Sequence, residues 1–166
     1  MSDKQQIAER QFIEEFGIVM EQTGLPRMAG RILGWLLIST PPHQSSEQLV
    51  KGLEASKGSI SSMTRFLIQV SLIERMSLPG VRGDYFRVRA DAWHNMIRRG
   101  LEDEIKMVRQ MAERALELLA DKPPLTRQWL EEMCNVYNFL EREFPTLLER
   151  WAQQREETSD QPRTSI

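Results

Sequence analysis

The sequence contains one cysteine, Cys134, and two histidines, His43 and His94, among its 166 residues. A lone cysteine cannot form an internal disulfide, and the histidines have no partner at metal-ligand spacing, so no structural zinc site is predicted. The sequence also lacks an HExxH motif and a glycine-rich phosphate-binding loop. These absences argue against an enzyme, and we expect no catalytic residue, no metal and no cofactor.

Long apolar segments are missing as well. The longest apolar run covers only residues 35–38, whereas a helix that crosses a bilayer needs about 20 apolar residues. The N-terminal stretch MSDKQQIAERQ is polar and has no apolar core of the kind that signal peptides carry. We therefore expect a cytoplasmic protein without a membrane partner, and a single cysteine agrees with a reducing compartment.

Charge is nearly balanced over the whole chain, at −2, but it is unevenly distributed. Residues 45–90 carry seven basic and four acidic side chains, a net charge of +3, whereas residues 91–157 carry ten basic and fourteen acidic ones, a net charge of −4. A basic segment beside an acidic one is typical of a protein that contacts a polyanion at one place.

Two helices are predicted in the N-terminal part of the chain. The first covers residues 3–22, and the second runs from Pro26 to about Ser39. The second is apolar around most of its circumference, which predicts a central place in the core. The apolar face predicted for the first helix consists of Phe12, Phe16, Val19 and Met20, with Ile13 beside them.

A short helix and a longer one follow, and then a hairpin. Ser45 with Gln48 three residues later matches a capping box, and Ser56 can cap a helix that reaches about Val70. Strands are predicted at residues 72–76 and 85–89, joined by SLPGVRG with a basic tip at Arg82. This order of elements predicts a mainly α protein built on a winged helix-turn-helix with a two-stranded wing.

The helix that begins at Ser56 has two distinct faces. At about 100° per residue, Ile60, Met63, Thr64, Leu67 and Val70 share one side, which we expect to be buried. The opposite side carries short polar groups and one long cation, without a carboxylate, and suits a DNA major groove. With the helix N-terminus and the wing included, the candidate DNA-binding residues are Ser45, Ser56, Lys57, Gly58, Ser59, Ser61, Ser62, Arg65, Gln69 and Arg82.

Two segments, GLPRMAGRILGWLLISTPPHQSSEQL and SKGSISSMTRFLIQVSLIERMSLPGVRGDYFRV, resemble the MarR superfamily of bacterial transcription regulators, specifically its GbsR-like branch. The resemblance spans residues 24–88. It implies a homodimer that binds double-stranded DNA at pseudo-palindromic operators as a repressor or an activator, with repression favoured. It assigns recognition to residues 56–59, 61, 62 and 65, and the wing to Pro79, Gly80, Arg82 and Gly83. Many relatives have a more basic wing tip.

Two long helices are predicted after the hairpin. Asp91 can cap the first, which runs to about Ala120, and Thr126 can cap the second, which Pro145 should kink or interrupt. The polar end of the chain is predicted to be disordered. The predicted organisation is an N-terminal helix with a possible dimer contact at 1–22, the DNA-binding domain at 23–90, dimerisation helices at 91–154, and a tail at 155–166.

The apolar stripes of the long helices exceed what one winged helix can cover, so a homodimer is predicted; the alternative is packing within the chain. The candidate interface residues are Leu101, Ile105, Val108, Leu130, Tyr137 and Leu140. A small-molecule effector is a further candidate partner, since the resemblance implies ligand sites near the dimer interface in many MarR-type proteins. The candidate lining residues of an effector pocket are Trp93, Trp129, Trp151 and Tyr137. Such aromatic residues are more often plain core, and Cys134 is more often inert packing than a redox sensor.

The function favoured by these patterns is a dimeric, sequence-specific DNA-binding regulator. In that role the helix at residues 56–70 occupies the major groove, while the wing at residues 77–84 contacts the minor groove or the backbone. The alternative is a winged-helix module that binds other proteins and has no role on DNA.

Overall fold

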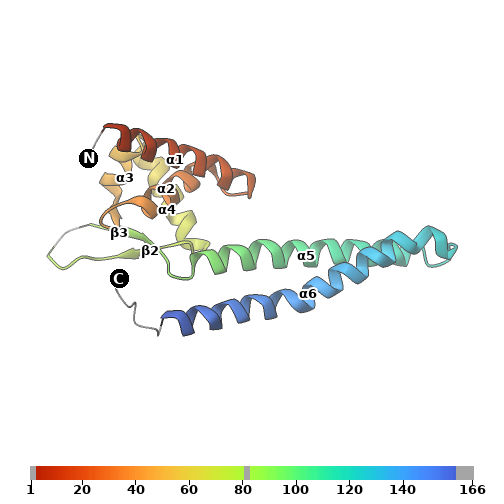
Figure 1. Ribbon diagram of the computed structural model, residues 1–166. Helices are drawn as coiled ribbons and strands as arrows, with labels where there is room; N and C mark the ends of the chain where they lie inside the picture. Colours follow the sequence, from red (N-terminus) through yellow and green to blue (C-terminus); the bar gives the residue numbers. More distant parts are fainter. Residues whose placement is uncertain (1–2, 81–82, 160–166) are drawn as a thin grey trace. The chain divides into compact units, whose positions relative to one another are not determined.

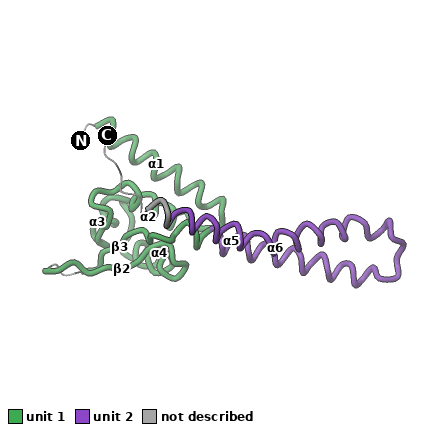
Figure 2. Tube along the Cα trace, turned by 60° about the horizontal axis from the view of Figure 1, so that its bottom comes forward, with its two compact units in different colours: residues 1–96 green, residues 97–166 purple. Residues whose placement is uncertain are grey.

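The computed structural model describes residues 3–80 and 83–159, with side chains as far as residue 155. The chain divides into two compact units, residues 1–96 and residues 97–166, shown in different colours in Figure 2. Among the described residues, no helix is long and apolar enough to cross a membrane.

Unit 1 combines helices with a small antiparallel sheet, and Figure 1 shows its strands β2 and β3 as a hairpin. Its elements are α1 (Asp3–Gln22), α2 (Arg27–Ile38), β1 (Gln44–Ser45), α3 (Ser46–Gly52), α4 (Lys57–Gln69), β2 (Ile73–Met76) and β3 (Tyr85–Val88). This is the predicted winged helix order. The sheet has three strands in the order β1-β3-β2, because Gln44 pairs with Phe86. A two-residue strand is too short to show an alternating pattern, so the sequence predicted only two strands.

The core of unit 1 forms around α2, as predicted from its apolar circumference. Ile32 and Leu33 are fully buried, and Leu36 is nearly so. They pack in one cluster with residues from α1, α3, α4 and the sheet: Ile13, Leu49, Ile60, Leu67, Ile73 and Phe86. Helix α4 therefore packs against the same hydrophobic core as the sheet.

Helix α1 forms where it was predicted, but its buried face is rotated from the predicted one. Ile13, Gly17 and Met20 are buried, whereas Phe12 is 38% exposed and Val19 is 49% exposed. A Cβ atom on Gly17 would lie 2.8 Å from Cγ of Arg31, so the glycine gives α2 the room to approach. Counting apolar residues missed this face because glycine adds no apolar signal.

Unit 2 consists of two long helices, α5 (Ala92–Leu118), which begins in unit 1, and α6 (Pro124–Ser159). Helix α6 starts at Pro124 rather than after Thr126, because proline suits the first helical position. It continues through Pro145, which therefore does not interrupt it. It also continues to Ser159, so residues 155–159 are helical where a disordered tail was predicted; residues 160–166 lie outside the described residues.

Burial is sparse in unit 2. Ile105, Ala112, Cys134 and Leu148 are its buried apolar residues among those described. Arg109 joins the two helices, since it pairs with Glu113 on α5 and Glu141 on α6, each at 2.6 Å. Many large apolar side chains remain exposed, including Met107, Met111, Leu118, Leu125, Trp129, Val136, Phe139 and Leu147.

Candidate nucleic-acid interface

Helix α4 presents the two faces that its sequence predicts. Ile60, Thr64 and Leu67 are buried, with exposed fractions of 1%, 3% and 0%. The polar Thr64 is satisfied inside the helix, because its Oγ1 donates a hydrogen bond to the carbonyl of Ile60 at 2.8 Å. Met63 and Val70 are half-buried. The inner face therefore packs α4 against the core, and the opposite face is exposed to solvent.

The outer face of α4 is exposed, and several of its side chains are short. Its exposed residues are Lys57, Gly58, Ser61, Ser62, Arg65 and Gln69, and none is a carboxylate. The Nε of Arg65 donates to the carbonyl of Ser61 at 3.2 Å, which lays the start of the side chain along the helix. A Cβ on Gly58 would meet only Oγ of Ser56, at 4.0 Å, so packing within the chain does not require a glycine there.

Two of the predicted DNA-binding serines, Ser45 and Ser56, cap helices with their side chains. Oγ of Ser56 accepts a hydrogen bond from the N–H of Ser59 at 3.1 Å and so caps α4, as predicted. Oγ of Ser45 accepts from the N–H of Gln48 at 3.2 Å, and the Gln48 side chain accepts from the N–H of Ser45 at 2.7 Å, which completes the predicted capping box of α3. Ser45 and Ser59 are half-buried. These contacts position the helices, and the exposed residues of α4 remain for a ligand.

Ion pairing sorts the basic residues of this region into two groups. Arg75, Arg87 and Arg89 pair with acidic residues within the chain, whereas Lys51, Lys57 and Arg65 form no ion pair with any described residue. Among these six described residues, the positive charge left to meet a polyanion therefore lies on α4 and at Lys51 on α3. The hairpin pairs are Arg75–Asp84 at 3.4 Å, Arg87–Glu74 at 2.5 Å and Arg89–Asp91 at 2.8 Å.

The Arg89–Asp91 pair joins the end of β3 to the start of α5. Nε and Nη2 of Arg89 donate to Oδ1 and Oδ2 of Asp91 at 2.8 and 2.9 Å, and this hydrogen bonding lowers the pKa of the Asp91 carboxyl far below its usual value. Asp91 precedes α5, as predicted for a cap, and its backbone carbonyl accepts the N–H of Asn95. The pair uses the positive charge of Arg89, which is thus unavailable to a ligand.

The wing is a hairpin in which Glu74 lies opposite Arg87. Gly80 and Gly83 have φ values of +76° and +123°, a conformation that glycine adopts without strain, so both residues suit the turn. Arg82, the predicted tip contact, lies outside the described residues.

Sequence reasoning did not single out Lys51. Its signal was its place in the last turn of α3, in the positively charged segment.

The residues predicted for dimerisation differ in exposure. Ile105 is buried inside unit 2, at 6%, whereas Leu101 and Leu140 are 42% and 36% exposed. Val108, Leu130 and Tyr137 are half-buried. Ile105 thus packs within the chain in the way the alternative interpretation expected, while Leu101 and Leu140 remain available to a partner.

The aromatic residues predicted to line an effector pocket have different surroundings. Trp93 packs edge-on with Phe16 in unit 1, with ring centroids 6.3 Å apart. Trp129 and Trp151, in unit 2, are 73% and 43% exposed. Tyr137 is half-buried. A pocket formed by these residues stays a prediction.

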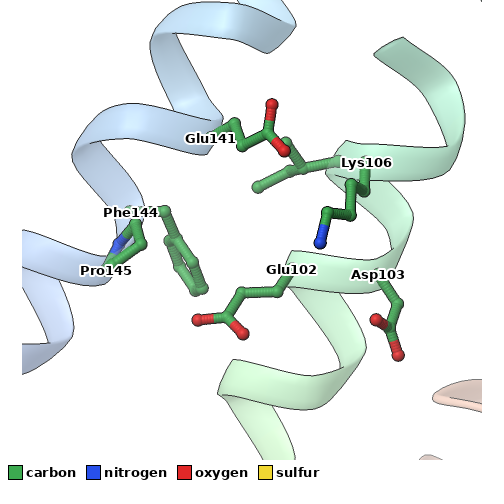
Figure 3. A pocket seen from close by; sticks show the side chains of 7 residues that line it. Glu102, Asp103, Lys106, Glu141, Phe144 and Pro145 are labelled. Atoms are coloured by element: carbon green, nitrogen blue, oxygen red, sulfur yellow. The ribbon is translucent and has the colours of Figure 1, made fainter. Parts of the chain in front are cut away.

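A cavity of about 260 Å³ lies between α5 and α6 in unit 2 (Figure 3). Its lining residues are Glu141, Phe144 and Pro145 from α6 and Glu102, Asp103, Ile105 and Lys106 from α5. Within the described residues, no group of three or more histidine, cysteine or acidic side chains could hold a metal ion.

Burial raises the pKa of the Cys134 thiol, which disfavours the reactive thiolate.

Comparisons with known proteins point to transcription regulators. A family described as the MmpR5-like MarR family transcriptional regulator matches residues 91–155. The HTH-type transcriptional regulator MmpR5 of Mycobacterium tuberculosis (strain ATCC 25618 / H37Rv) is 38% identical over 143 residues, which cover 86% of each chain. The HTH-type transcriptional repressor OpcR of Bacillus subtilis (strain 168) is 31% identical over 90 residues, 54% of this chain and 48% of that protein.

A solved structure agrees with these sequence comparisons. It is described as the crystal structure of a transcriptional regulator, and it superimposes with a TM-score of 0.66. Its sequence is 37% identical, and the similarity covers 88% of this chain and 99% of that one. The similarity therefore extends over most of the chain.

Proposed function

The chain belongs to the MmpR5-like MarR family of transcriptional regulators, and from that premise we propose that it acts as a homodimeric repressor on a pseudo-palindromic DNA operator. The family consists of transcription regulators, which are not enzymes. Repression is supported by one relative, OpcR of Bacillus subtilis, which is named a transcriptional repressor. Membership of a GbsR-like branch stays a prediction.

The outer face of α4 is the observation that carries this proposal. Short side chains at Gly58, Ser61 and Ser62 let the helix backbone approach the floor of a major groove. The terminal nitrogens of Arg65 can then bind guanine O6 and N7, the commonest specific contact to a base. Lys57 lies at the N-terminus of the same helix, where the helix dipole favours a phosphate.

Two such helices are required to read an operator with twofold symmetry. In dimeric helix-turn-helix proteins they contact major-groove sites about 34 Å apart, one turn of DNA. The exposed apolar residues of unit 2, among them Leu101 and Leu140, support the dimer, because a surface of this kind is seldom left to water. The wing at residues 77–84 is proposed to contact the minor groove or the phosphate backbone.

Fluorescence anisotropy with labelled DNA from upstream of its own gene tests this function. Arg65→Ala should weaken specific binding by about 10- to 100-fold, the usual value of a bidentate base contact. Arg87→Gln is the matched control. Because Arg87 already pairs with Glu74, this substitution should change the affinity for DNA by less than about twofold. Wild-type affinity should also fall steeply with salt, as bound phosphates release counterions.

Three results would count against the proposal. The affinity could be insensitive to salt, or Arg65→Ala could bind as tightly as the wild type. The wild type could also fail to discriminate between upstream DNA and random DNA of equal length. The last result, together with a stable complex with another protein, would favour the interaction module instead.

A further inference from the structure

Arg31 is a cation in the middle of α2, the most apolar helix of unit 1. Its side chain is only 20% exposed, whereas the side chains of the other ion-paired arginines of this unit are between 38% and 69% exposed. Sequence reasoning did not single it out, although a charge inside the apolar helix RMAGRILGWLLI, beyond the one at its first residue, was a signal. A largely buried guanidinium needs partners to offset its lost hydration.

The partners of Arg31 come from elements on either side of α2. Its Nη2 donates a hydrogen bond to the backbone carbonyl of Leu53 at 3.1 Å. Its Nε lies 2.6 Å from Oε1 of Glu14 on α1, as an ion pair whose N–H is not aligned for a hydrogen bond. Its Nη1 lies 3.7 Å from the sulfur of Met28. One side chain thus links α1 to the end of α3.

The Leu53 carbonyl belongs to the turn between α3 and α4. Carbonyls at a helix C-terminus have no partner inside the helix, and a cation there also offsets the negative end of the helix dipole. The turn continues through Glu54, which has a φ of +51°, an uncommon value for a residue other than glycine. Three residues after Leu53 comes Ser56, the cap of α4. A shift of the Leu53 carbonyl would therefore be passed along a short turn to the first residues of α4.

Trp35 holds the same turn from the other side. A Cβ atom on Gly52 would lie 2.2 Å from the indole ring of Trp35, so the ring lies directly against the end of α3. The indole N–H donates to the side chain of Gln44 at 3.3 Å, which ties the ring to β1. The indole ring is therefore a natural reporter of any movement of this turn.

We propose that Arg31 is a positioning residue for DNA binding. Its guanidinium holds the α3–α4 turn through Leu53, Glu14 orients the guanidinium, and the recognition helix α4 takes its place from the turn. Arg31 contacts no DNA in this role. The inference rests on the proposed function for its effect on affinity, and it has a structural readout that is independent of DNA.

Arg27 provides a matched control on the same helix. It lies one turn before Arg31, and its Nη2 pairs with the same carboxylate, Oε2 of Glu14, at 3.3 Å. No contact joins Arg27 to the Leu53 carbonyl among the described residues. Arg27→Gln and Arg31→Gln therefore both remove an α2 cation beside Glu14, but only Arg31→Gln also releases the turn.

The first experiment measures the affinity of both variants for specific and random DNA. Arg31→Gln should lose about tenfold or more in affinity for the specific site, since hydrogen bonds of charged groups are among the stronger ones. Its affinity for random DNA should stay within about twofold, because its phosphate-binding cations are intact. Arg31→Lys should fall between, because an ammonium group lacks the planar fork that reaches both partners. Arg27→Gln should match the wild type.

The second experiment follows the turn without DNA. With 5-fluorotryptophan incorporated, the ¹⁹F resonance of Trp35, assigned with Trp35→Phe, should shift in Arg31→Gln and stay in place in Arg27→Gln. Amide exchange of the turn should accelerate in the same variant. These readouts test Arg31 even where the wild type binds no specific DNA, a result that would refute the proposed function alone.

Other results would overturn the inference. One is an Arg31→Gln variant that keeps the wild-type ¹⁹F resonance and amide exchange of the turn. Another is an equal loss of specific affinity in Arg27→Gln and Arg31→Gln, which would assign the effect to charge beside Glu14. An equal loss on specific and random DNA would mean that Arg31 binds phosphate or supports the fold in general.

Discussion

Units 1 and 2 both consist largely of amphipathic helices, yet they bury their apolar residues to very different extents. In unit 1, Ile32 and Leu33 are completely enclosed, because α1, α3, α4 and the sheet surround α2. In unit 2 the buried apolar residues among those described are few, and Met107, Met111 and Trp129 are 64%, 60% and 73% exposed. The candidate DNA-reading surface is therefore supported by a core within its own unit, whereas the exposed apolar side chains of the long helices are consistent with the proposed dimer.

The largest expected effect concerns the core of unit 1. Leu33→Ala should lower the free energy of unfolding by about 2–5 kcal/mol, because it removes a fully buried side chain and leaves a cavity. Leu37→Ala, on the same helix at 38% exposure, is the control and should cost much less. Urea denaturation followed by circular dichroism measures both. Equal losses would show that α2 is not the centre of the core.

The second prediction tests the need of unit 2 for a partner. The double variant Leu101→Glu and Leu140→Glu should raise the dimer dissociation constant about 100-fold or more, because a carboxylate without a partner is costly to bury. Gln110→Glu, at an exposed position of α5, controls for the added charge. Sedimentation equilibrium gives the constants. A dimer of undiminished stability would place the interface elsewhere, and a monomeric wild type would remove the comparison.

A smaller effect is expected at Gly58, where stability and affinity should change in opposite directions. Gly58→Ala should raise the free energy of unfolding by up to about 1 kcal/mol, since alanine is the better helix former and its Cβ meets open space. Specific DNA affinity should nevertheless fall, because the added methyl group keeps the backbone away from the groove. Thermal unfolding and anisotropy measure the two effects. An unchanged affinity would show that DNA does not approach this residue closely.

The smallest effect concerns Cys134 and alkaline pH. Burial raises the pKa of its thiol above the ordinary value of 9.0, so the folded state favours the neutral form. Its contribution to stability is therefore complete below pH 9 and is lost as pH rises toward the folded-state pKa. Cys134→Ala should remove this alkaline decline, measured by urea denaturation at several pH values. Equal iodoacetamide labelling rates for native and unfolded protein would contradict the burial.

Features that depend on neighbouring residues were predictable from the sequence. The caps at Ser45 and Ser56 follow from side-chain hydrogen bonds that span three residues. The inner face of α4 follows from the helical period, and the central place of α2 follows from its apolar circumference. The start of α6 was missed, because Thr126 and Pro124 both carry starting signals and the sequence does not rank them.

Features that depend on distant residues were missed. The sequence gives the net positive charge of residues 45–90, but it could not show that Arg75 and Arg87 pair with acidic residues. Those ion pairs depend on strand register and turn geometry. The buried face of α1 depends on the room that Gly17 leaves for Arg31. The strand β1 needs a partner, β3, that lies some forty residues away.

The sequence by itself therefore determined the order of elements of a winged helix, the caps of α3 and α4 and the two faces of α4, since each depends on spacings within about one or two helical turns. The tertiary structure alone decided which cations remain unpaired, because ion pairs form between residues that only folding brings together. It placed Lys57 and Arg65 on an exposed face without acidic partners, and Arg31 between Glu14 and the turn before α4.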